Sequence, residues 1–273
     1  MPRLKNRAYQ QVCLLFSLSL AALSSCERAA PEPSFMVASS LSNALSQWAQ
    51  EREQRAEPSL SWQGAGSQRI TQWMKGGARP TVAILAARSQ VESLREAGLV
   101  SWELELGCTA LALVRRSPRV TPQERGALSE EVWRDWGLGL SRDARLAIAA
   151  EEVPLGHYSE QLLSRSVAKF GPMWGERARG ALRSRPLSAG ATLALLRAGE
   201  VDAALLYMSS RSAAQRREYD WRACPRSLSP QPRYIAVGSQ AEGRALAERL
   251  RRWILARPEL GVSVCNEAGA GER

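Results

Sequence analysis

Four loops of the chain carry hydroxyl groups and small residues just before a predicted helix. They read Ala38-Ser39-Ser40-Leu41, Gly64-Ala65-Gly66-Ser67, Glu152-Val153-Pro154-Leu155-Gly156-His157-Tyr158 and Leu187-Ser188-Ala189-Gly190-Ala191-Thr192. A helix N-terminus offers unpaired N–H groups and the positive end of the helix dipole, both of which favour an anion. A single serine before a helix is more often a helix cap than a ligand, so only the convergence of several loops would make a binding site.

Residue types that carry covalent or metal chemistry are scarce. The chain has one histidine, His157, which could be paired with Ser40 or Ser188 in a hydrolase, a minor alternative. The Gly-x-Ser-x-Gly nucleophile elbow is absent from the sequence, and we expect His157 on a helix at the rim of the site. The sequence also lacks a Cys-x-x-Cys pair or a Cys/His cluster, so we expect neither an enzyme nor a metal cofactor.

The four loops belong to an alternation of short apolar runs and helical patterns. We expect strands at 34–38, 59–62, 81–85, 108–114, 145–149, 203–207 and 234–237. We expect helices at 41–52, 68–75, 89–97, 158–165, 174–184, 192–198 and 241–255. This order is typical of mostly parallel sheets covered by helices, whose ligands bind where strands end and helices begin.

The first 34 residues read as an export and anchoring signal. Three basic residues precede an apolar stretch at 12–23, which is too short to span a bilayer comfortably. The stretch ends in Leu23-Ser24-Ser25-Cys26, which resembles the bacterial lipoprotein box. We therefore expect a signal peptide at 1–25, and a lipidated Cys26 with a tether at 26–34 on the periplasmic or external side of a membrane. The alternative is an uncleaved signal anchor with an incidental cysteine.

Three cysteines remain after that signal, and an exported protein can pair two of them. Cys108 lies in an apolar run and is expected to be a small buried residue, while Cys224 and Cys265 are weak candidates for a bridge, which stays open.

The net charge of +10 does not indicate nucleic-acid binding. It comes from 37 basic residues against 27 acidic ones, and only Lys5, Lys75 and Lys169 are lysines. The arginines are scattered and are not interleaved with aromatic residues, as a surface for base stacking would require.

Two segments carry the most specific family pattern, RLAIAAEEVPLGHYS at 145–159 and ATLALLRAGEVDAALLY at 191–207. Shorter segments agree with them, namely ASSL at 38–41, GS at 66–67, GARPTVAILAA at 77–87 and GCTALALV at 107–114. Over about residues 35–256, these segments resemble the periplasmic molybdate-binding proteins of ABC importers.

The resemblance implies a two-lobed periplasmic-binding-protein fold of type II, with the ligand between the lobes. Lobe 1 would comprise residues 35–112 and 208–273, and lobe 2 residues 113–207. The implied ligand is molybdate or tungstate, held by hydroxyls and backbone amides of five residues: Ser40, Ser67, Leu155, Ala189 and Tyr207. The implied partners are an ABC permease with its ATPase and the membrane that holds the lipid, and the protein would be a monomer without a cofactor.

Three positions depart from the resemblance. Aspartates of the family pattern are replaced by Thr81, Ala87 and Ala150. Two hypotheses therefore stay open: an oxyanion receptor, or a fold-retaining accessory or sensory lipoprotein that binds another oxyanion or no ligand.

Overall fold

The computed structural model describes residues 34–116, 127–141, 143–212 and 215–265. The expected signal peptide at 1–25, the lipidation site Cys26 and the tether up to residue 33 lie outside the described residues. Within the described ranges, no helix combines the length and the apolar character needed to cross a bilayer.

The first sheet has six strands in the order β11-β4-β10-β3-β1-β2. Its members are β1 (Ser34–Ala38), β2 (Ser61–Ala65), β3 (Val82–Leu85), β4 (Trp102–Thr109), β10 (Arg233–Gly238) and β11 (Val262–Ser263). β1 runs parallel to β2 and β3, as the alternating pattern predicted. β10 and β11 are antiparallel to their neighbours, and the chain reaches them after it has formed the second sheet.

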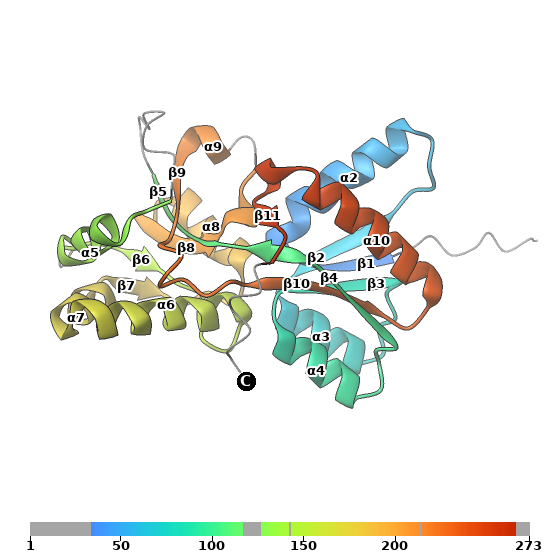
Figure 1. Ribbon diagram of the computed structural model, residues 1–273, viewed down its shortest axis with the longest axis horizontal. Helices are drawn as coiled ribbons and strands as arrows, with labels where there is room; N and C mark the ends of the chain where they lie inside the picture. The colour runs from blue at the N-terminus through green and yellow to red at the C-terminus, as the bar shows by residue number, and fades with distance from the viewer. Residues whose placement is uncertain (1–33, 117–126, 142, 213–214, 266–273) are drawn as a thin grey trace, which may run out of the picture. The chain divides into compact units, whose positions relative to one another are not determined.

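Helices cover both faces of the first sheet (Figure 1). They are η1 (Ser39–Leu41), α2 (Ser42–Gln54), α3 (Ser67–Lys75), α4 (Arg88–Glu96), α10 (Ala241–Leu255) and η4 (Pro258–Leu260). Alternate residues of β3 show the two-sided burial: Val82 and Ile84 pack with α2 and α10, while Ala83 and Leu85 pack with α3 and α4. A strand buried on both faces reads as a continuous apolar run, which is why this element was recognisable from the sequence.

The second sheet has five strands in the order β7-β6-β8-β5-β9. They are β5 (Leu111–Arg116), β6 (Leu146–Ala147), β7 (Leu182–Ser184), β8 (Ala203–Tyr207) and β9 (Tyr219–Ala223). The accompanying helices are α5 (Glu130–Leu138), α6 (Pro154–Phe170), α7 (Pro172–Gly180), α8 (Ala189–Ala198), η3 (Met208–Ser210) and α9 (Gln215–Glu218). Two buried tryptophans, Trp133 and Trp174, anchor the core of this half.

The chain passes between the sheets through two crossing segments, residues 109–111 and 224–232. The single strand expected at 108–114 is interrupted at Ala110, because β4 ends in the first sheet and β5 begins in the second. β9 pairs with β5 and so belongs to the second sheet. The chain rejoins the first sheet at β10, whereas the sequence predicted the return to lobe 1 at residue 208. The two-sheet α/β fold of the periplasmic-binding-protein type is confirmed.

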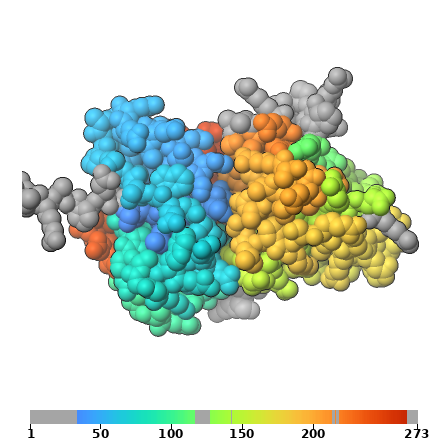
Figure 2. Space-filling view, turned by 180° about the vertical axis from the view of Figure 1, so that it is seen from behind, coloured from blue at the N-terminus to red at the C-terminus, as the bar shows by residue number. Residues whose placement is uncertain are grey.

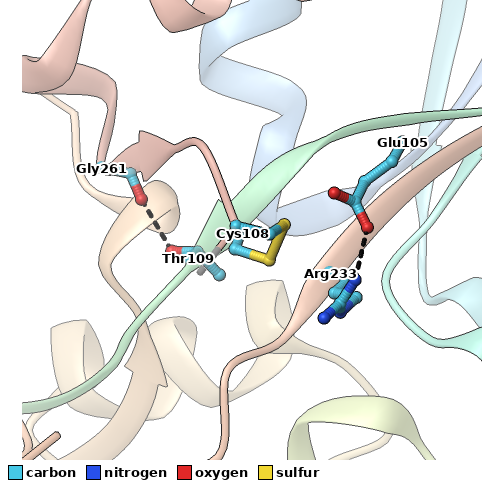
Figure 3. Close-up of a disulfide and its surroundings, with 6 residues drawn as sticks. Glu105, Cys108, Thr109, Arg233 and Gly261 are labelled. Carbon is cyan, nitrogen blue, oxygen red and sulfur yellow. Dashed lines mark hydrogen bonds and ion pairs between the residues drawn. A yellow bond between two sulfur atoms is a disulfide. The ribbon is translucent and has the colours of Figure 1, made fainter. Parts of the chain in front are cut away.

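The disulfide joins Cys108 to Cys265, so the expectations for both residues need correction. Cys108 is buried as predicted, but it is bonded, and the buried Cys224 is the free thiol. β11 pairs antiparallel with β4 and sets Ser263 opposite Cys108, which brings Cys265 within bonding reach (Figure 3). Gly107 permits this approach, because a Cβ there would lie 2.7 Å from the Ser263 carbonyl oxygen.

Cys265→Ala should lower the free energy of unfolding by about 2–5 kcal/mol, since the bridge closes a sequence separation of 157 residues. Urea denaturation with and without dithiothreitol measures the loss. The reductant should bring the wild-type protein to the level of the variant and leave the variant unchanged. Equal stability of oxidised and reduced wild-type protein would refute a stabilising bridge.

Candidate functional site

A small cavity lies between the two sheets, where four helices begin. Its thirteen lining residues come from η1, α3, α6, α8, the end of β8 and adjoining loops: Ala38, Ser39, Ser40, Gly66, Ser67, Ala86, Val153, Pro154, Leu155, Leu187, Ser188, Ala189 and Tyr207. The cavity is small, with a volume of about 20 Å³. The space therefore suits a compact ligand.

All five residues expected at the site line this cavity. Ser40, Ser67, Leu155, Ala189 and Tyr207 are each at most 6% exposed, although the chain separates the first from the last by more than half its length. Elements of both halves contribute, and Figure 2 shows the blue and cyan surface of the early residues directly against the yellow and orange surface of the later ones. Their role as ligands stays a prediction.

The hydroxyl oxygens of Ser40 and Ser67 each accept a hydrogen bond from another group of the protein. Ser67 Oγ accepts a hydrogen bond from the Ala86 amide at 3.0 Å. Ser40 Oγ accepts one from the Tyr234 hydroxyl at 2.7 Å. Because a hydroxyl carries one hydrogen and can accept as well, each serine keeps its own hydrogen for a further acceptor. Both hydroxyls are thus prepared to donate.

Tyr207 brings a buried donor that the protein does not satisfy. Its hydroxyl has no hydrogen-bond partner among the described residues, and the side chain is 2% exposed. Burial raises the pKa of Tyr207 well above its ordinary value of 10.0, so the group stays protonated and donates only where an acceptor enters. An unsatisfied buried hydroxyl is costly, which points to an acceptor supplied by a ligand.

Backbone amides add donors at two helix starts. In α6, the first helical hydrogen bond runs from the His157 amide to the Val153 carbonyl, so the Leu155 amide precedes the bonded turn. In α8, Ser188 caps the helix by accepting from the Ala191 amide at 3.1 Å, and the Ala189 amide again lies ahead of the bonded turn. Such first-turn amides lack partners within the helix and lie at the positive end of its dipole.

The cavity presents hydrogen-bond donors but no charged side chain. None of the thirteen lining residues is ionisable at neutral pH, and the described part of the chain holds no group of three or more metal-ligating side chains. A cation therefore finds no counter-charge here. An anion with several acceptor oxygens matches hydroxyls and amides that converge on one point.

The structure adds residues that the sequence did not assign to the site. Ser39 and Ser188 also line the cavity, and Tyr234 lies behind Ser40. The sequence indicates a helix cap at Ser188, because a serine there precedes a predicted helix. Tyr234 lies in a predicted strand, and nothing in the sequence points to a place near the site. His157 is exposed and contacts Gln161 at 3.0 Å, in agreement with a place on the rim.

The three residues that stand in place of the family's aspartates, Thr81, Ala87 and Ala150, are not among the proposed donors. Thr81 accepts a hydrogen bond from the Ser34 amide at 3.0 Å and so braces β1 against the turn before β3. Ala87 and Ala150 are buried. None of these three residues lines the cavity. The replacement of the aspartates therefore changes the packing around the loops and leaves the proposed donors in place.

Residues 34–259 match the model of a family described as bacterial extracellular solute-binding protein. No curated protein matches the chain.

Solved structures share the fold at low identity. The periplasmic molybdate-binding protein of Azotobacter vinelandii has a TM-score of 0.66 at 19% identity, covering 86% of this chain and all of its own. PEB3 of Campylobacter jejuni, bound to L-phospholactate, has a TM-score of 0.65 at 10% identity, with 86% and 100% covered. The sulfate-binding protein SubI of Mycobacterium tuberculosis has a TM-score of 0.59 at 13% identity, with 87% and 88% covered. These similarities show the fold alone.

Tyr207→Phe should stabilise the ligand-free protein by about 1 kcal/mol, because it removes a buried hydroxyl without a partner. Tyr234→Phe is the matched control, since its hydroxyl bonds two serines and its loss should be destabilising. Urea denaturation of both variants measures the difference. If Tyr207→Phe destabilises the protein as much as Tyr234→Phe, the Tyr207 hydroxyl has a protein partner after all.

Alkaline solution should weaken the fold. The pKa values of Cys224, Tyr207 and Tyr234 are raised above their ordinary values of 9.0, 10.0 and 10.0, mainly by burial. Above about pH 9 these groups ionise in the unfolded chain and stay neutral in the folded one, so the free energy of unfolding falls as pH rises. Denaturation at about pH 8 and about pH 10 tests this, and Cys224→Ala should show a smaller fall. An equal fall in the variant would exclude the thiol as a cause.

Proposed function

Because the chain belongs to the bacterial extracellular solute-binding protein family, we propose that it captures a tetrahedral oxyanion, molybdate or tungstate, for an ABC importer. Its role as a solute-binding protein is not enzymatic. The observation that carries the choice of ligand is the unpartnered Tyr207 hydroxyl in a neutral cavity that also presents Ser40 and Ser67.

The donor set fits a fully deprotonated oxyanion. Three hydroxyls, from Ser40, Ser67 and Tyr207, and two amides, from Leu155 and Ala189, surround the cavity. A dianion such as molybdate only accepts hydrogen bonds, and every one of these groups can donate one. Hydrogen bonds to charged groups contribute about 1.5–3 kcal/mol each, so five neutral donors hold a dianion without a counter-charge.

The arrangement of the donors suggests how capture proceeds. Donors come from helices of both sheets, and the chain joins the sheets only through the two crossing segments. Rotation about these segments would open the cavity, and a bound oxyanion would favour the closed form because it contacts both halves. The closed form then docks on an ABC permease, with the protein held at the membrane through a lipid on Cys26.

A second candidate keeps the fold without molybdate transport. Thr81, Ala87 and Ala150 replace the aspartates of the molybdate-binding pattern, and SubI, which shares the fold, is named for binding sulfate. An accessory or sensory lipoprotein that binds another oxyanion, or none, would fit these replacements.

Calorimetric titration with molybdate, tungstate, sulfate and phosphate distinguishes the two candidates. We expect molybdate or tungstate to bind the wild-type protein. Ser67→Ala and Tyr207→Phe should each weaken that affinity by about 10- to 100-fold, as expected for one hydrogen bond to a charged group.

Two matched variants control for the loss of a buried hydroxyl. Ser166→Ala and Tyr219→Phe change buried residues outside the cavity and should leave the affinity unchanged. Binding of sulfate alone would favour the second candidate, and binding of none of the four anions would reject oxyanion capture. Undiminished affinity in both site variants would reject the donor set.

A further inference from the structure

Tyr234 is a buried tyrosine directly behind the cavity. Its side chain is 1% exposed and lies at the start of β10, just after the second crossing segment. Its hydroxyl lies 2.7 Å from Ser40 Oγ and 2.6 Å from Ser209 Oγ. It does not line the cavity: its hydroxyl bonds Ser40, and its ring lies edge-on to the ring of Tyr207, with the centroids 6.3 Å apart.

The hydrogen count fixes the direction of these bonds. Tyr234 has one hydrogen and donates it to Ser40, so the bond between Tyr234 and Ser209 must be donated by Ser209. With its oxygen already accepting, Ser40 has its own hydrogen left for the cavity. The sequence Ser209, Tyr234, Ser40 is therefore a one-way relay of hydroxyl donors.

Burial keeps the relay in this state. Desolvation raises the pKa of Tyr234 well above its ordinary value of 10.0, although its hydrogen bonds with Ser209 and Ser40 oppose the shift. Tyr207 and Tyr158 also face this region, and the Tyr207 hydroxyl is likewise held neutral by burial. A neutral Tyr234 has a hydrogen to give, whereas an ionised one would take the hydrogen of Ser40.

The far end of the relay is fixed at the first crossing segment. The Ser209 amide donates to Thr109 Oγ1 at 3.3 Å, and Thr109 Oγ1 donates to the Gly261 carbonyl at 2.8 Å. Thr109 follows Cys108 of the disulfide, and Figure 3 shows its bond to Gly261 beside the bridge. The relay therefore connects Ser40 to backbone that is held in place by pairing and by a covalent bond.

We propose that Tyr234 is a positioning residue that, through Ser209 and Ser40, fixes the direction in which the Ser40 hydroxyl donates to the bound oxyanion. This inference rests on the proposed function. Without Tyr234, the Ser40 hydroxyl can rotate and must be ordered again at each binding event, which lowers affinity. Tyr234→Phe keeps the ring that packs on Tyr207 and removes only the hydroxyl that bonds Ser40 and Ser209, so the effect of this substitution disappears when Ser40 has no hydroxyl.

A double-mutant cycle by calorimetry tests this coupling. The probe is whichever of molybdate, tungstate and sulfate binds the wild-type protein most tightly. Tyr234→Phe should weaken affinity by about 2- to 10-fold, and Ser40→Ala by about 10- to 100-fold. Adding Tyr234→Phe to Ser40→Ala should then change affinity by less than about 2-fold. Tyr219→Phe, at a buried tyrosine outside the relay, should have no effect in either background.

The outcomes separate this inference from the function on which it rests. If the wild-type protein binds an anion and the two substitutions multiply independently, Tyr234 has only a structural role and the inference is overturned. If the wild-type protein binds none of the three anions, the proposed function fails and the inference fails with it. If Tyr234→Phe does not fold, Ser209→Ala takes its place in the cycle. Ser209→Ala should lower the affinity for the anion by a smaller factor, and this effect must also vanish in the Ser40→Ala background.

Discussion

The cost of burying hydrogen-bond donors without acceptors shapes the centre of this protein. Ser40, Ser67 and Tyr207 place hydroxyls around one cavity, and no acidic side chain lines it. For the two serines, the protein supplies a donor to the oxygen and so leaves the hydrogen free. For Tyr207 it supplies nothing among the described residues. Such an arrangement is unfavourable in isolation, and a hydrogen-bond acceptor that entered the cavity would relieve it, so ligand binding would also stabilise the fold.

The remainder of the architecture serves to hold these donors in place. Each sheet carries helices whose N-termini reach the cavity. In the first sheet, β3 is buried on both faces, and the helices α2 and α3 pack in separate cores on its two sides. The crossing segments are short, and the disulfide from Cys108 ties the C-terminal strand β11 beside the first of them. Because β4 and β11 both belong to the first sheet, the bridge fixes the position in that sheet from which the first crossing segment leaves.

The hydrophobic patterns of single segments predicted many of the helices and strands. The run Val82–Leu85 is apolar throughout because both faces of β3 are buried, and the helix Ala241–Leu255 shows a clear apolar stripe. The site residues were reached through the resemblance to molybdate-binding proteins rather than from spacing alone, and the structure brings all five to one cavity.

Long-range pairing accounts for what the sequence did not predict. The partner of Cys265 depends on β11 pairing with β4, a two-residue strand with no pattern of its own. β9 was missed because its sequence, Tyr219–Ala223, mixes charged and aromatic residues, and its place depends on β5. Tyr234 reads as an ordinary strand residue, and only its hydrogen bonds to Ser209 and Ser40 reveal its place behind the cavity.

We propose that the Tyr207 hydroxyl and its neighbours in the cavity bind a tetrahedral oxyanion. A crystal structure of the protein with tungstate, located by its anomalous scattering, tests it most directly. The account predicts one strong peak in the cavity, with an anion oxygen within hydrogen-bond distance of Tyr207 Oη, Ser40 Oγ and Ser67 Oγ. A tungstate bound elsewhere on the surface, with the Tyr207 hydroxyl still unpaired, would contradict it.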